Sequence, residues 1–116
     1  MHFLFKGRNF LIISLGAIPA AIFRWQIDEI IIVNIIGCFV LGFINALSIS
    51  KQYKLMLGFG FCGSLTTFSG WMFNLFTLLN HSLYLQLFFK LFAMLSLGFC
   101  AVFFGDYVAK KLKKLV

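Results

Sequence analysis

Acidic residues and proline are almost missing from this chain of 116 residues, which contains three Asp or Glu residues and one Pro. All charged residues together make up only 11% of the chain, whereas about 25% is usual for a soluble domain. The hydrophobic share is 62% and the mean hydropathy is +1.02. These values exclude a soluble domain and indicate an integral membrane protein.

No carboxylate lies deep in an apolar segment, because Asp28 and Glu29 form the acidic loop and Asp106 falls within a turn of the end of the last segment. A proton-coupled carrier needs a membrane carboxylate. A phosphate-binding loop, a metal-ligand cluster and a serine placed with a histidine and a carboxylate are missing as well. The sequence therefore predicts no enzyme. Cys38, Cys62 and Cys100 all fall inside apolar segments, so we interpret them as small buried hydrophobic residues.

Four apolar segments approach the length of about 20 residues that crosses a bilayer. We expect helices at about residues 9–25, 30–50, 54–79 and 88–108, within a single all-α membrane domain over 1–116. The basic start and the small residues from Ala17 to Ala21 resemble a signal peptide. Cleavage there would remove Gly16 and leave an odd number of spans, so we interpret this segment as the first helix.

The net charge of +7 reflects membrane topology, because the basic residues gather at the ends of the segments and form no patch for nucleic acid. If the chain crosses four times, only Arg24 and Lys90 lie on one side. The other side holds Lys6, Arg8, Lys51, Lys54, Lys110, Lys111, Lys113 and Lys114. This excess predicts both termini in the cytoplasm.

Small and polar residues mark the faces on which the helices meet. Gly16 and Ala20 stand four apart and favour a close helix contact, as does the series Ala93, Leu97, Ala101 and Gly105. Asn34 and Asn45 are eleven residues apart, close to three turns, so they share one helix face. That face is either a polar track or a site of interhelical hydrogen bonding. Arg24 is either an interfacial anchor or an anion-attracting residue at a pore mouth.

The third segment is interrupted by the run from Gly58 to Gly70, rich in glycine and hydroxyl residues. Unpaired backbone groups at membrane depth survive only in protein or beside a polar cavity. We expect a helix break between Gly58 and Thr67 whose free carbonyls can coordinate a cation. Phe68 and Trp71 follow on one face, where ordinary aromatic packing is the simpler interpretation.

Three motifs together resemble the Fluc (CrcB) family of bacterial fluoride channels over nearly the whole chain. The most specific is Gly60-Phe-Cys-Gly63-Ser-Leu-Thr66-Thr67-Phe68-Ser69. The others are Gly16-Ala17-x-x-Ala20-x-x-x-Arg24-Trp25 and Asn34-x-x-Gly37-x-Phe39-x-x-Gly42.

The resemblance implies a fluoride-selective channel that exports fluoride passively, built as an antiparallel, dual-topology dimer of four-helix protomers in the cell inner membrane. It implies a structural sodium ion at the dimer centre, held by the main-chain carbonyls of Gly63 and Thr66 from each protomer. The implied fluoride pathway comprises Asn34, Phe68, Trp71, Thr67, Ser69 and Ser96, with Arg24 at the vestibule. Aromatic ring edges are positively polarised and suit an anion.

Three features depart from the family pattern. Trp71 stands where the family has a second phenylalanine, Ser96 is the one candidate for the serines of the last helix, and the charge bias suits a single orientation. The partner is therefore a second copy or an oppositely oriented paralogue. A small multidrug-resistance-type transporter and a non-conducting membrane subunit remain as alternatives, although the former needs a membrane carboxylate.

Overall fold

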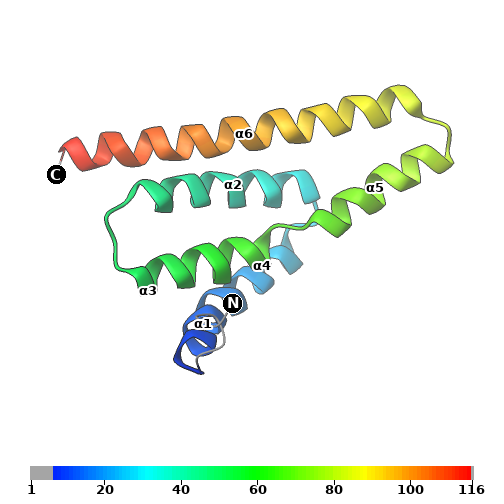
Figure 1. Ribbon diagram of the computed structural model, residues 1–116. Helices are drawn as coiled ribbons and strands as arrows, with labels where there is room; N and C mark the ends of the chain where they lie inside the picture. The colour runs from blue at the N-terminus through cyan, green and yellow to red at the C-terminus, as the bar shows by residue number, and fades with distance from the viewer. Residues whose placement is uncertain (1–6, 116) are drawn as a thin grey trace.

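The computed structural model describes residues 7–115, and all regular structure within that range is helical (Figure 1). Lys6 of the basic set and the outermost residues of both termini lie outside the described range. The elements are α1 (Gly7–Gln26), α2 (Ile30–Ala46), α3 (Lys51–Lys54), η2 (Leu55–Cys62), α4 (Gly63–Leu65), α5 (Phe68–Asn80) and α6 (Tyr84–Leu115). Because α3, η2, α4 and α5 follow one another with only Thr66 and Thr67 between them, they form one bent helix. The predicted all-α fold of four helices with an interrupted third is thus confirmed.

The helices stack in the order α6, α2, η2 and α1, with α2 between α6 and the first half of the bent helix (Figure 1). Glycines permit this stacking by bringing backbone against backbone. A Cβ atom at Gly42 would collide with the Val102 carbonyl oxygen, and one at Gly105 would collide with the carbonyl of Phe39. Gly16 meets the Met56 carbonyl in the same way, which confirms the predicted close contact of the first helix.

Two helices have bounds that differ clearly from the sequence expectation. The second helix ends at Ala46 instead of about residue 50, because Leu47 is extended and the Ser50 side chain caps α3 by accepting a hydrogen bond from the Tyr53 N–H (3.4 Å). The last helix runs beyond the expected 88–108, from Tyr84 to Leu115.

Membrane-spanning character is clearest in α6. Within residues 7–115 it is the one unbroken helix long and apolar enough to cross a bilayer. The apolar α2 has 17 residues, which correspond to about 26 Å, and the third helix is divided into pieces.

The packed face of α6 is shifted from the one the sequence predicts. Its buried residues are Met94, Gly98, Gly105 and Ala109, whereas Leu97 is exposed. Residues exactly four apart drift around a helix of 3.6 residues per turn, so a series at constant spacing leaves the contact face. Cys100 lies two residues after the buried Gly98, about 200° around the helix, so it is exposed and not buried as expected.

A small apolar core lies where α1, α2 and α4 meet. It consists of Ala20, Val33 and Leu65, which are at most 1% exposed, with Ile27 and Phe61 packed against it. Leu65 directly precedes the bend in the third helix. The core therefore fixes the bend from one side.

Candidate functional site

The bend in the third helix has two parts of different geometry. The stretch Leu55–Cys62 is a π-helix, in which the Gly63 N–H reaches back to the carbonyl of Gly58. After the short α4, Thr66 and Thr67 are extended, with φ/ψ of −80°/156° and −145°/119°. π-Helical turns are rare and are frequent at functional sites. The true interruption is therefore at Thr66–Thr67, at the end of the predicted run.

The glycines of this run act differently from the sequence expectation, because Gly58, Gly60 and Gly63 all remain helical and none has a positive φ. Gly60 allows close approach instead: a Cβ atom there would collide with the Ile13 carbonyl oxygen of α1. At Gly58 the nearest atom would be Leu41 Cδ1 at 4.0 Å, an ordinary contact.

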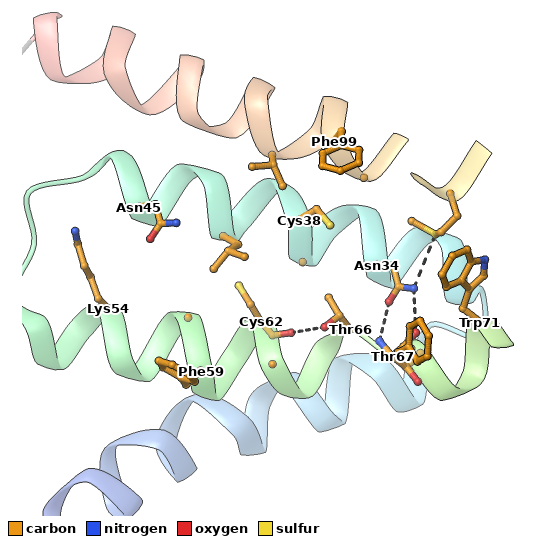
Figure 2. A pocket seen from close by; sticks show the side chains of 18 of the residues that line it. Asn34, Cys38, Asn45, Lys54, Phe59, Cys62, Thr66, Thr67, Trp71 and Phe99 are labelled. Atoms are coloured by element: carbon orange, nitrogen blue, oxygen red, sulfur yellow. Dashed lines mark hydrogen bonds between the residues drawn. The ribbon is translucent and has the colours of Figure 1, made fainter. Parts of the chain in front are cut away.

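Asn34 holds the interruption from the neighbouring helix α2. Its Oδ1 accepts a hydrogen bond from the Thr67 N–H (2.7 Å), and its Nδ2 donates to the Thr67 carbonyl (3.1 Å). Nδ2 also lies 3.9 Å from Met94 Sδ of α6. Asn34 and Thr67 are only 8% and 6% exposed. One side chain thus satisfies both backbone groups of an extended residue that has left the helical ladder (Figure 2).

Side chains replace the helical hydrogen bonds on both sides of the interruption. In a continuous α-helix the Thr67 N–H would bond the Gly63 carbonyl, and the Gly70 N–H would bond the Thr66 carbonyl. The first N–H donates to Asn34, and the second donates to Thr67 Oγ1 (3.1 Å), which caps α5. The carbonyls of Gly63 and Thr66 therefore lose their regular donors. Thr66 itself still bonds to the preceding helical turn, because its N–H and its Oγ1 both donate to the Cys62 carbonyl.

An open groove of about 750 Å³ runs between α2, the bent helix and α6. Asn34, Thr67, Phe68 and Trp71 line one end, and Gly63 and Thr66 line its wall. The other end is lined by Asn45, Lys51 and Lys54, as well as by apolar residues. The two asparagines expected on one helix face therefore do share one groove (Figure 2).

Phe68 and Trp71 form an edge-to-face pair, with ring centroids 5.8 Å apart and an interplanar angle of 73°. Phe68 is 71% exposed, whereas Trp71 Nε1 is buried and has no hydrogen-bond partner within residues 7–115. Figure 2 shows the indole nitrogen on the side of its ring away from Asn34. The indole therefore presents its carbon surface to the groove in this conformation.

The remaining predicted site residues lie outside the groove wall. Ser69 is exposed, with Oγ 3.4 Å from Thr67 Oγ1. Ser96 lies on an exposed face of α6, and Arg24 is exposed in the last turn of α1. Conversely, Lys54 lines the groove although the sequence indicated only a topological role for it. Its position four residues before Gly58 could have been noticed, but the sequence alone does not show that its side chain lines a groove between helices.

Comparison with known proteins gives consistent results. The family described as CrcB-like protein, Camphor Resistance (CrcB), matches residues 11–106. The chain is 51% identical over 107 residues to the fluoride-specific ion channel FluC 1 of Prochlorococcus marinus (strain NATL2A), covering 92% of this chain and 94% of that protein.

More distant relatives carry similar names. FluC 2 of Synechococcus sp. (strain CC9902) is 34% identical over 93% of this chain and 84% of its own length. FluC of Methanocaldococcus jannaschii is 34% identical over 88% of this chain and 94% of its own length. Both are described as fluoride-specific ion channels.

Proposed function

Because this chain belongs to the CrcB family of fluoride-specific ion channels, we propose that fluoride crosses the membrane along the groove beside Asn34, Thr67, Phe68 and Trp71. The chain is a membrane channel and not an enzyme, and its function is fluoride resistance through passive export. Family membership decides against the multidrug-resistance-type transporter considered from the sequence.

The proposed pathway rests on the chemistry of the groove near the interruption. Fluoride is small and strongly hydrated, so a narrow path must replace water with donors. The Asn34 amide, the Thr67 hydroxyl and the ring edges of Phe68 and Trp71 are polar or positively polarised without carrying full charge. Weak binding of this kind allows an ion to leave as well as to bind. The proposed pathway also includes Ser69 and Ser96, which are exposed in the single chain. Arg24 is assigned to the vestibule of the pathway.

A structural sodium ion fits the carbonyls of Gly63 and Thr66. The support is their loss of helical donors to Asn34 and Thr67 side-chain atoms. No group of three His, Cys, Asp or Glu side chains that suits a metal occurs between residues 7 and 115, and neutral main-chain oxygens are common ligands of hard cations. Two carbonyls from each of two protomers would supply four oxygens. When bound, the ion would fix the interruption and join the protomers.

The sodium proposal is tested with the purified protein in buffers that contain sodium or only potassium. We expect the assembly, followed by size-exclusion chromatography and thermal unfolding, to be more stable with sodium. Equal stability in both salts would contradict the proposed site.

An antiparallel dimer in the cell membrane would cover the groove with a second protomer. Large apolar side chains such as Phe59 (63% exposed) and Phe99 (66% exposed) line the groove of the single chain and would be covered. The basic ends agree with termini in the cytoplasm for one orientation: Lys113 Nζ donates to Ser48 Oγ (2.8 Å), so the end of α6 meets the α2–α3 loop. The partner is a second copy or an oppositely oriented paralogue.

Fluoride efflux from liposomes tests the pathway. The purified chain is reconstituted, a potassium gradient with valinomycin sets the voltage, and a fluoride electrode follows release, with chloride as the control ion. We expect rapid release of fluoride and not of chloride, and slower release for Asn34→Asp and Phe68→Ile. Phe73→Ile is the matched control, since Phe73 lies on the same helix, is 67% exposed and does not line the groove.

The outcomes separate the parts of this proposal. Wild-type flux by the chain alone supports the homodimer, whereas flux only after co-expression with a paralogue supports the mixed dimer. Wild-type flux that is unchanged by both pathway substitutions would show that fluoride takes another route.

A further inference from the structure

The groove has a second polar end, which lies beyond the residues named above for the fluoride pathway. Asn45 and Lys54 line it together with Lys51, about three helical turns along α2 from Asn34. In Figure 2 the Lys54 side chain rises from the bent helix on the side that faces α2, at the same end of the groove as Asn45. The groove therefore connects an ammonium group at one end with the Asn34–Thr67 hydrogen bonds at the other.

The Lys54 charge is not neutralised within the described part of the chain. No ion pair involving Lys54 occurs between residues 7 and 115, and the Asp106 carboxylate pairs with Lys110 of its own helix (2.9 Å). Asp28 and Glu29 precede α2, at the opposite end of that helix from Asn45. Lys51, one helical turn earlier, lines the same end of the groove.

From this geometry we propose that Lys54 concentrates fluoride at the mouth of its pathway and so sets the rate at low fluoride concentration. The proposal rests on the fluoride channel function and adds a role at a position so far interpreted only as a marker of topology. A positive charge at the rim of a cleft with low-dielectric walls raises the local concentration of anions. At the mouth the ion keeps much of its water, so attraction does not become trapping, as it would deeper in the groove.

Screening by salt distinguishes this role from a structural one. The Debye length is about 30 Å at 0.01 M salt and about 3 Å at 1 M salt. An ammonium group that attracts fluoride over several ångströms therefore raises the flux at low salt and has no effect on it at high salt. A lysine that merely supported the fold would matter equally at both.

The experiment compares fluoride efflux from liposomes that contain wild type, Lys54→Gln, Lys54→Arg or Lys111→Gln, each in the assembly that conducts. Lys111→Gln is the matched control: it removes the same charge, but Lys111 lies over the Tyr107 ring of α6 (5.2 Å) and does not line the groove. Flux is measured at low fluoride in 0.01 M and 1 M inert salt, and again at saturating fluoride.

We expect Lys54→Gln to lower the flux about two- to five-fold at low salt and low fluoride. The deficit should vanish at 1 M salt or at saturating fluoride, and Lys54→Arg and Lys111→Gln should behave as wild type. Equal flux of Lys54→Gln and wild type under all conditions would overturn the proposal, and this is the result expected if a second protomer covers Lys54. A deficit independent of salt would overturn it too, by showing a structural role. Absence of flux from wild type both alone and with the paralogue would instead refute the channel assignment.

Discussion

Replacing Asn34 by alanine tests whether one side chain holds the interruption of the third helix. The substitution removes the acceptor of the Thr67 N–H and the donor to the Thr67 carbonyl. Thr67 is 6% exposed, so water reaches neither group easily. Both backbone groups would be left buried without a partner.

The expected cost follows from these two lost hydrogen bonds. A buried donor or acceptor left unsatisfied costs about 1–3 kcal/mol, which gives about 2–6 kcal/mol for the pair. The measured free energies of hydrogen bonds between membrane helices lie toward the low end of this range, because polar groups of the unfolded chain in the membrane also form hydrogen bonds. We therefore expect Asn34→Ala to lower the free energy of unfolding by about 2–3 kcal/mol.

Unfolding of the purified protein in mixed micelles, titrated with a denaturing detergent, measures this cost. Asn45→Ala is the control, because Asn45 lies on the same helix and lines the same groove but is exposed and makes no hydrogen bond within residues 7–115. It should change the free energy by less than about 0.5 kcal/mol. If Asn34→Ala and Asn45→Ala were equally stable, the interruption would not depend on Asn34.

Two further substitutions test the packing of the bent helix. Gly60→Ala places a Cβ atom on the Ile13 carbonyl of α1 and should lower the free energy of unfolding by at least about 1–3 kcal/mol in the same titration. Gly58→Ala is the control, because a Cβ atom there meets only ordinary contacts and should be tolerated. Equal effects of the two substitutions would refute the close approach of Gly60 to α1. Trp71→Phe removes an indole N–H that is buried and has no partner among residues 7–115, so the free energy of unfolding should stay unchanged or rise by up to about 1 kcal/mol. Trp25→Phe, at an 81% exposed position, is its control, and a clear loss of stability in Trp71→Phe alone would show that the N–H has an acceptor in the assembled protein.

The sequence predicts the helical class and the interrupted third helix well, because length, hydropathy and the hydroxyl-rich run are local features. It also places Asn34 and Asn45 on one face, since helical periodicity alone decides this. The sequence predicts the position of the interruption less well, because this position depends on the Asn34–Thr67 hydrogen bonds, which join residues 33 positions apart. The π-helix and the contact face of α6 depend on packing between helices, which no local pattern encodes.

Lys54 illustrates why charge patterns alone were insufficient at the site. Counting lysines at the ends of segments treats each as a marker of membrane sidedness, whatever its direction around the helix. Only the three-dimensional arrangement shows that Lys54 lines the groove and that Lys111 lies outside its wall. The same limitation applies to Ser96, which the sequence suggested as a pathway residue and which lies on an exposed face of the single chain.

The double hydrogen bond between Asn34 and Thr67 also bears on regulation. A hinge needs backbone groups that can exchange partners when the chain moves, but both groups of Thr67 are held by a side chain from a different helix, and the next turn is capped by Thr67 itself. The interruption is therefore a rigid joint and not a gate. With no moving part at this point, we expect the rate of export to follow the fluoride gradient and the membrane voltage directly, so that a cell would adjust its resistance through the number of channels it makes.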